Sequence, residues 1–296
     1  MRAKKLYIPL YNMQNTGLNR VTIDKYYTKK DVVTDCVQLI KSNIYIDREN
    51  DLIIEPSAGN GAFVDDLRKL CNHCDFYDIQ PDHESIEEQD YLELNVDFET
   101  HMMHPQIHVV GNPPFGRQST HAIKFIKKSV EFCNSISFIL PRSFKKDSMK
   151  KHFPLDFHLV LEKDIPSESF LVDGKSHDVP CIFQIWEKRE TKREKPQKHK
   201  PYGYEFVKKE EEHDISFRRV GVYAGAIDTN TENKSSQSHY FIRFQSDTGS
   251  CLEQMMDELK SIDFGCKDNT VGPRSISKQE LMKEFNAIIQ KHVGLS

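Results

Sequence analysis

The stretch "IIEPSAGNGAF", residues 53–63, joins an apolar, strand-like run to a helix-like run through a turn rich in small residues. Glu55 stands where the strand is expected to end, and Gly59 and Gly61 follow at G-x-G spacing. Glycines at such a position let the backbone turn sharply and let a ligand approach it closely. The stretch lacks the third glycine of a dinucleotide-binding turn and the Lys-Ser/Thr of a phosphate loop, so by itself it is equally compatible with a plain tight turn.

Strand-like and helix-like segments alternate on both sides of this turn. We expect strands at 51–55, 74–79, 107–110, 135–140, 158–161 and 181–186, helices at 32–40, 62–70 and 121–132, and a short element at 91–94. Such alternation predicts an α/β, Rossmann-like domain with a doubly wound, mostly parallel sheet that helices cover on both faces.

The character of the chain changes after residue 187. Residues 188–200 are polar and basic and predict a linker that is either solvated or in contact with phosphates. Beyond it, strand-like segments at 204–207, 217–222 and 239–244 and helix-like segments at 252–259 and 278–291 predict a smaller C-terminal α+β domain. We therefore expect a first domain at 1–187, a linker at 188–200 and a second domain at 201–296.

Composition restricts the class of protein. The chain has 296 residues with a net charge of -4, and 29% of them are charged. It contains no apolar run of about 18 residues, which predicts that it does not span a membrane. The basic start, Met1 to Lys5, is followed by no apolar segment of a signal peptide, so we expect a cytoplasmic location. The net charge gives no overall sign of nucleic-acid binding.

The seven cysteines follow no pattern, which favours reduced thiols over a disulfide framework. Cys71 and Cys74 form a lone C-x-x-C without the second pair of a zinc ribbon, so we expect no metal site.

A second unusual turn, "VVGNPPFGRQS" at 109–119, follows the expected strand at 107–110. Two consecutive prolines lock the backbone of this turn and remove its hydrogen-bond donors. Asn112 offers a side-chain carbonyl, Pro113 offers a rigidly placed backbone carbonyl before Pro114, and Phe115 offers a flat face for a base. Two acceptors aimed at the hydrogens of a planar amine would help that amine to pyramidalise and attack.

The ends of other expected strands carry residues suited to a nucleoside. Asp78 follows the glycines by about 20 residues, where a carboxylate accepts the two hydroxyls of a ribose. Ile79 could cover a face of an adenine, and Asp90 with Tyr91 could meet its amino edge. Because these residues end successive strands, we expect them to form one nucleoside pocket.

Taken with the Asn-Pro-Pro-Phe turn, this pattern resembles the S-adenosylmethionine-dependent amino-methyltransferases, and most closely the N6-adenine DNA methyltransferases whose cofactor motif precedes the catalytic one. The resemblance covers residues 24–187. The segments "FILPRSF" and "VPCIFQIW" also look similar to uncharacterised methyltransferase-like proteins of phages and large DNA viruses. The resemblance implies a class I methyltransferase fold and S-adenosyl-L-methionine as cofactor.

The resemblance also implies roles for individual residues. Thr28 would help to hold the methionine carboxylate, although Lys29 replaces the proline that follows it in the family. The cofactor would contact Thr28, Glu55, Ser57, Gly59, Gly61, Asp78, Ile79, Asp90 and Tyr91, and the catalytic motif would be Asn112, Pro113, Pro114 and Phe115.

A target base inside a duplex must be flipped out or already unpaired. Phe170 is the candidate for a second wall facing Phe115, or else a buried anchor of its loop. Arg117 is a candidate phosphate contact, as are Arg142, Lys145 and Lys146, unless these are merely solvated charges.

The leading hypothesis is methylation of adenine N6 in DNA or RNA. Because the amine of a glutamine side chain or of guanine N2 is equally planar, a protein glutamine or a guanine-N2 RNA methyltransferase is an alternative. A catalytically silent binding subunit is another. The second domain, with Arg218 and Arg219, could read the substrate or could simply pack. The sequence predicts no oligomeric state.

Overall fold

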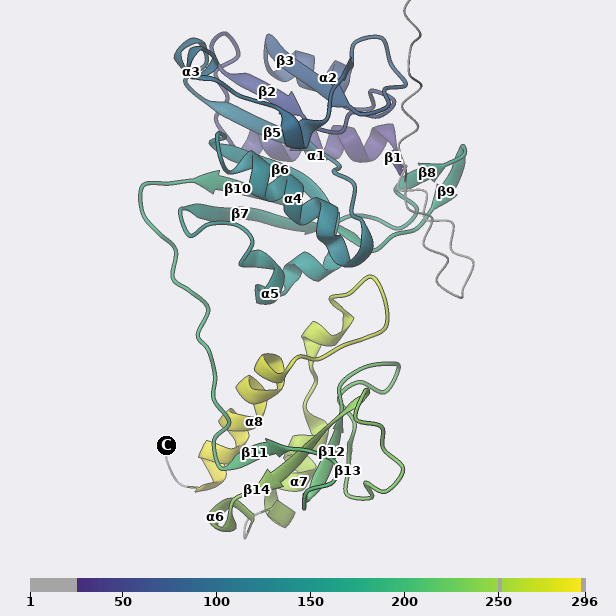
Figure 1. Cartoon of the computed structure of the whole chain (residues 1–296), viewed down its shortest axis with the longest axis vertical. Coiled ribbons are helices and arrows are strands. Elements are labelled where there is room, and N and C mark those ends of the chain that lie inside the picture. The colour runs from purple at the N-terminus through teal and green to yellow at the C-terminus, as the bar shows by residue number, and fades with distance from the viewer. Residues whose placement is uncertain (1–25, 250–251, 294–296) are drawn as a thin grey trace, which may run out of the picture.

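The computed structural model describes residues 26–249 and 252–293 and shows two packed bodies joined by a long connection (Figure 1). The first contains the predicted α/β sheet, and the second is built from residues 204–293. The expectation for Met1 to Lys5 and the thiol of Cys251 lie outside the described residues.

The first body is organised around a seven-stranded sheet. In spatial order its strands are β4 (Glu87–Glu88), β3 (His73–Asp78), β2 (Leu52–Glu55), β5 (Ile107–Gly111), β6 (Ser135–Pro141), β10 (Cys181–Lys188) and β7 (Phe157–Asp164). The first five run parallel, and β10 is antiparallel to both β6 and β7. From β2 the chain proceeds outward through β3 and β4 and then returns to β5 on the other side. This reversal is that of a doubly wound sheet, so the predicted Rossmann-like α/β fold is confirmed.

Helices cover both faces of this sheet, and Figure 1 shows α1 and α4 on opposite sides of it. The buried positions of α1 (Lys30–Asn43) and α2 (Val64–Leu70) share one apolar cluster, and those of α4 (Thr120–Ser129) belong to a second. Short elements complete the connections: α3 (Phe98–Met103), α5 (Asp147–Lys150), η1 (Tyr91–Glu93), η2 (Arg117–Ser119) and η3 (Arg142–Lys145). Every residue of β6 is buried, as expected for a central strand covered on both faces.

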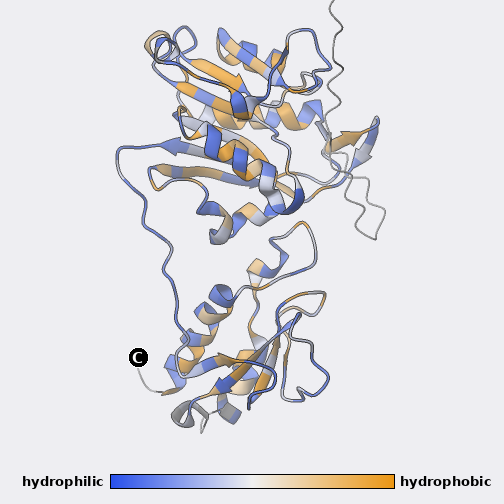
Figure 2. Ribbon diagram, in the orientation of Figure 1, coloured by the Kyte–Doolittle hydropathy of each residue, from blue (hydrophilic) through white to orange (hydrophobic). Residues whose placement is uncertain are grey.

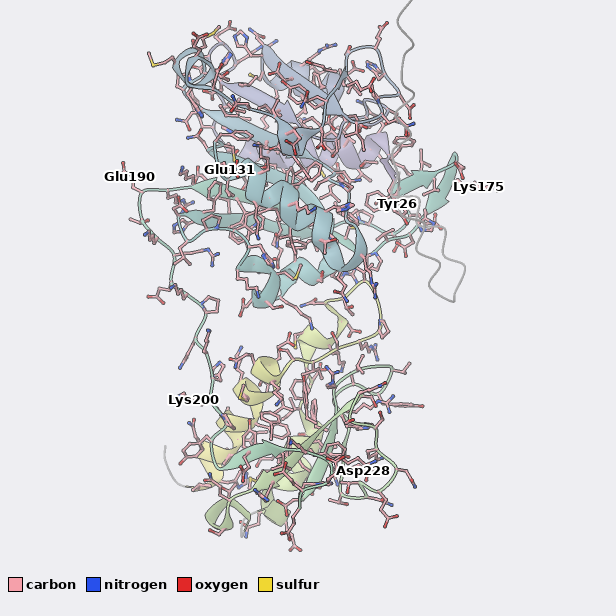
Figure 3. All side chains as sticks on the ribbon, viewed as in Figure 1. Tyr26, Glu131, Lys175, Glu190, Lys200 and Asp228 are labelled. Atoms are coloured by element: carbon pink, nitrogen blue, oxygen red, sulfur yellow. The ribbon has the colours of Figure 1, made fainter. Side chains whose placement is uncertain are left out.

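A small three-stranded sheet lies beside the large one. It consists of β1 (Tyr27–Thr28), β8 (Phe170–Val172) and β9 (Lys175–His177), all paired antiparallel. Figure 3 places Tyr26 and Lys175 together at this edge of the molecule. The sequence analysis placed a loop at residues 170–177. The structure shows a hairpin of β8 and β9 there instead.

The second body is a four-stranded antiparallel sheet with helices against one face. The sheet order is β11 (Tyr204–Val207), β14 (His239–Phe244), β12 (Ile215–Arg218) and β13 (Ile227–Asp228), and the helical elements are α6 (Ser246–Gly249), α7 (Leu252–Ser261), η4 (Gly265–Asp268) and α8 (Lys278–Val293). It has an apolar cluster of its own. The strand predicted at 217–222 is wrong in its second half, because β12 ends at Arg218 and Gly221 adopts a φ of 99° in the turn that follows.

The connection between the two bodies is hydrophilic along most of its length (Figure 2) and is bound at both ends. Near its start, Arg193 donates hydrogen bonds to the carbonyl oxygens of Lys150, Phe153 and Phe157. Near its end, the backbone of His199 exchanges two hydrogen bonds with the side chain of Gln279 on α8. Arg193 and His199 are half-buried at these two anchors, and the other residues of 188–200 are exposed, as expected for a solvated linker.

One cation also joins the two bodies directly. The Nζ of Lys146, which follows η3, donates to the carbonyl of Ser275 at 2.8 Å and lies 3.3 Å from Glu280 Oε1 on α8. Arg142 and Lys145 both pair with Asp164. These three cations, considered as phosphate contacts from the sequence, are thus already engaged by protein groups.

A buried polar network lies at the starts of three neighbouring strands. His108 contacts Ser135 Oγ through Nδ1 at 2.8 Å and Asp51 Oδ2 through Nε2 at 3.3 Å. All three side chains are buried, so the arrangement is closed to any substrate despite its likeness to a Ser-His-Asp triad. Burial lowers the pKa of His108 despite the opposing effect of Asp51, which keeps the ring neutral near pH 7.

We predict that His108 weakens the fold in acid. A histidine whose pKa is lowered by folding contributes stability above its unfolded pKa, about 6.5, and this contribution is lost as the pH falls below that value. His108→Gln should therefore flatten the fall in urea midpoint between about pH 6.5 and 5, whereas His101→Gln, at an exposed position, should leave the slope as in the wild type. Equal slopes for wild type and His108→Gln would contradict this prediction.

Candidate active site

The two unusual turns of the sequence meet at the carboxyl edge of the large sheet. β2 and β5 are adjacent and parallel, with Ile54 opposite Val109, and they mark the point where the strand order reverses. Open α/β sheets bind ligands in the crevice at this position. Ser57 Oγ donates to the backbone carbonyl of Asn112 at 3.1 Å and so joins the glycine turn to the Asn-Pro-Pro-Phe turn. The structure therefore brings together the two predicted motifs.

Asp78 fixes the glycine turn from the neighbouring strand. Its Oδ2 accepts a hydrogen bond from Gly59 N at 2.8 Å, and its Oδ1 accepts one from Gln80 N at 2.8 Å. Each carboxylate oxygen retains a second lone pair, so a ligand hydroxyl can still bind. Ile79 beside it is 51% exposed, so its side chain is accessible to a ligand.

The two glycines form the sharp turn that the sequence predicts, and neighbouring side chains add a second reason for them. Gly59 and Gly61 adopt φ values of 54° and 77°. A Cβ on Gly59 would lie 3.1 Å from the ring of Tyr27, and one on Gly61 would lie 2.8 Å from the ring of His83. The space that a side chain would need is thus taken by aromatic rings of the protein. Tyr27 also donates a hydrogen bond to Asp82, which holds the ring over the turn.

Glu55 is a buried acid at the end of β2 with an unsatisfied oxygen. Its Oε2 has no hydrogen-bond partner, and Gly111 leaves room for the side chain, since a Cβ there would lie 3.2 Å from Glu55 Cγ. Burial, reinforced by the negative charge of Asp78, raises the pKa of Glu55 to about 8. The carboxyl group is therefore protonated at neutral pH unless a cation or donor reaches it.

Asn112 presents a fixed amide with a free acceptor. Its Nδ2 donates to the carbonyl of Tyr26 at 3.2 Å and to Thr28 Oγ1 at 3.2 Å. The carbonyl of Tyr26 can only accept, so the nitrogen must face it and Oδ1 must point the other way. Asn112 Oδ1 is buried and has no partner. Leaving a buried acceptor unpaired costs about 1–3 kcal/mol, which indicates that a ligand donor completes the site.

Tyr26 and Thr28 reach the site because of the small sheet. Thr28 in β1 lies opposite Phe170 in β8, and Lys29 N donates to the carbonyl of Ser169. Thr28, predicted to hold a cofactor carboxylate, lies beside Asn112. Sequence reasoning missed Tyr26, because a backbone carbonyl carries no side-chain signal.

Two assignments require correction. Phe170 is only 1% exposed and its ring packs edge-on against Tyr26, so it anchors the small sheet and offers no free face to a base. Tyr91 is also buried, with its ring stacked on Phe125 and its hydroxyl bonded to Ser129 Oγ at 2.7 Å, so it belongs to the core rather than to an adenine edge. Asp90 is exposed and caps η1 by accepting from Leu92 N.

The rest of the Asn-Pro-Pro-Phe turn follows directly after β5. Pro113 is buried, and Pro114 and Phe115 are half-buried. Phe115 contacts both apolar clusters of the large sheet. Arg117 is exposed.

Among residues 26–249 and 252–293, no group of three or more His, Cys, Asp or Glu side chains is arranged to hold a metal ion. No helix in the described part of the chain is both long and apolar enough to cross a membrane.

No family model and no curated protein matches this sequence. Several solved structures resemble it. One, from Pyrococcus horikoshii and proposed to be an RNA methyltransferase, is 16% identical with a TM-score of 0.45, over 57% of this chain and 89% of that one. The 23S rRNA methyltransferase ErmE is 13% identical with a TM-score of 0.40, over 57% of this chain and 71% of its own.

The N-methyltransferase NodS from Bradyrhizobium japonicum is 13% identical with a TM-score of 0.38, over 54% of this chain and 96% of its own. At these identities and scores, none of these proteins assigns an activity or a substrate to this chain.

We predict that Glu55 makes the protein less stable as the pH rises. An acid whose pKa is raised by folding stabilises the fold fully below its unfolded pKa, about 4.5, and this contribution is lost as the pH passes through about 8. In the absence of ligand, Glu55→Gln should abolish a loss of about 5 kcal/mol between these limits, measured by urea unfolding. Glu88→Gln, at an exposed site, is the control. A wild-type stability that does not fall more steeply than that of Glu55→Gln would refute the assignment.

Proposed function

We propose that this protein is a methyltransferase that transfers a methyl group from S-adenosyl-L-methionine to the N6 amine of adenine in nucleic acid. The observation that carries the proposal is the buried, unpartnered Oδ1 of Asn112 beside the glycine turn. An acceptor fixed in this way requires a donor, and an exocyclic amine is a donor that a nucleobase supplies.

The chemistry of a planar amine explains why acceptors are needed. The lone pair of such an amine is delocalised into its ring, which makes it a poor nucleophile. Asn112 Oδ1 and the carbonyl of Pro113 would each accept one N–H and so draw the nitrogen toward a tetrahedral geometry. Phe115 would hold the base by stacking. Fixing the amine in this position supplies the proximity that an encounter in solution lacks.

The residues present fit the proposed cofactor. When bound, S-adenosylmethionine supplies an electrophilic methyl group on a positively charged sulfur. The unsatisfied Oε2 of Glu55 suits the ammonium group of its methionine part, and such a cation would bring the Glu55 carboxyl back to its charged form. Asp78 would accept the ribose hydroxyls, and the exposed Ile79 would cover the adenine.

The same acceptor also suits other planar amines. A glutamine side chain or guanine N2 would satisfy Asn112 Oδ1 equally well, and no described contact separates them from adenine. Nucleic acid is preferred because an aromatic ring, Phe115, stands beside the acceptor and because Arg117 is exposed on the same turn.

We predict that Thr28 acts by orienting Asn112. Thr28→Val removes the hydroxyl acceptor but keeps the shape of the side chain, so the amide loses one of its two restraints. This should lower kcat about fivefold to tenfold with little change in the KM for S-adenosylmethionine, and Thr28→Ser should restore kcat. A rise in that KM alone would instead support the role as a holder of the methionine carboxylate.

We predict that adenine is the methylated unit. Purified protein and isotope-labelled S-adenosylmethionine are incubated with duplex DNA, single strands, RNA and protein extract, and the digested products are identified by mass spectrometry. N6-methyladenine is expected, and Asn112→Ala should reduce its formation about a hundredfold or more by analogy with the loss of other transition-state hydrogen bonds.

Two further measurements separate chemistry from cofactor binding. By calorimetry, Asn112→Ala should bind S-adenosylmethionine as the wild type does, whereas Asp78→Ala should bind it more weakly. Label on glutamine alone would end the adenine assignment, and unchanged cofactor affinity in Asp78→Ala would argue against the pocket.

A further inference from the structure

A loop of the second body, residues 219–226, exposes two large side chains to solvent. Val222 is 75% exposed and Tyr223 is 73% exposed. The backbone of this loop is held by its own hydrogen bonds: Gly225 N donates to the carbonyl of Arg218, and Ala224 N donates to that of Gly221. A loop that is bonded internally and still presents an aromatic ring to solvent has a ready-made contact surface.

A cavity of about 220 Å³ adjoins this ring, lined by Tyr223 together with Arg218, Asp228, Lys234 and His239. Typical small-molecule sites are about 300–1,000 Å³. The cavity is below this range, so it can hold one group of a larger ligand whose remainder lies outside it.

The charges around the cavity favour a phosphate. Lys234 forms an ion pair with Asp228 and keeps two of its three N–H donors, so Lys234, Asp228 and Arg218 together give the lining one net positive charge. Arg218 uses its Nε for the carbonyl of Val220, and the guanidinium keeps further N–H groups for a ligand.

His239 adds an acceptor of a different kind. The side chain is only 7% exposed, and its Nδ1 lies 3.1 Å from the carbonyl of Ser235, which can only accept. Nδ1 therefore carries the proton, and Nε2 is left as an acceptor in the neutral ring. Burial is the main cause that lowers the pKa of His239 and keeps it neutral. The pocket thus combines an aromatic face, cationic donors and one neutral acceptor.

The loop is also fixed with respect to the first body. Val220 forms an isolated bridge with Ser275, and the carbonyl of Ser275 accepts from Lys146, which follows β6 of the large sheet. A ligand bound in this cavity would therefore lie at a fixed position relative to the Asn-Pro-Pro-Phe turn.

We propose that this pocket binds one unpaired nucleotide of the substrate strand, with its base stacked on Tyr223 and its phosphate at Arg218 and Lys234. The proposal rests on the proposed function, since the strand is the one whose adenine is methylated at Asn112. A nucleotide held here fixes the register of the strand, which phosphate contacts scattered over the surface do not do.

The test is equilibrium binding of the full chain, without cofactor, to fluorescent single-stranded RNA and DNA of the same sequence, followed by anisotropy. Tyr223→Ala should weaken binding about tenfold, the typical effect of losing one base–aromatic stack. Tyr223→Phe should bind as the wild type does, because it retains the ring. The matched control is Tyr45→Ala, which removes a tyrosine that is 85% exposed in the first body and should change nothing.

A second variant tests the phosphate contact. Lys234→Ala should weaken binding and reduce the salt dependence of the binding constant by about one unit of slope. Lys283→Ala, at an exposed position on α8, is its control.

The outcomes separate this proposal from the proposed function. If the wild type methylates adenine but Tyr223→Ala binds both strands as the wild type does, the pocket is refuted and the function stands. If binding falls in Tyr223→Ala but no adenine is ever methylated, the pocket is supported and the function fails. Absence of binding to either strand by the wild type refutes the pocket, and a preference for RNA or DNA identifies the natural strand.

Discussion

The site depends on the parallel pairing of β2 with β5. Each strand ends at the same edge of the sheet, and the chain leaves the two ends in opposite directions, so neither exit blocks the other. The hydrogen bond from Ser57 to the backbone of Asn112 then fixes the two turns to each other. If this pairing slipped by one residue, Glu55 would leave the crevice and face the opposite layer, because successive side chains of a strand point to opposite faces.

Two buried acceptors without partners, Glu55 Oε2 and Asn112 Oδ1, lie at this edge of the sheet. They differ in what they demand, because one belongs to an acid whose pKa is raised by burial and the other to a neutral amide. A cation satisfies the first and a neutral N–H satisfies the second. In the proposed complex, Glu55 would take the charged donor and Asn112 the neutral one.

The sequence predicted the large sheet well, because buried parallel strands are nearly continuous apolar runs and their ends are marked by glycine or proline. It also predicted that the two turns would meet. It failed where a residue type is ambiguous: Tyr91 and Phe170 are aromatic residues near strand ends, and nothing in their identity separates a core ring from a binding wall. The β8–β9 hairpin did leave a signal, since Asp173 and Gly174 both have positive φ and Asp-Gly favours such a turn. The contact of the Tyr26 carbonyl with Asn112 left no signal in the sequence, because every residue has a backbone carbonyl.

The connection between the two bodies limits how far they can separate. Its first part is fastened by Arg193 and its last part by His199, so only the residues between these two anchors can lengthen when the Lys146 contact breaks. Extended backbone spans at most about 3.5 Å per residue. The chain from Arg193 to His199 therefore spans about 20 Å at most. The second body can tilt or lift only over this distance and cannot reach distant parts of a long polymer.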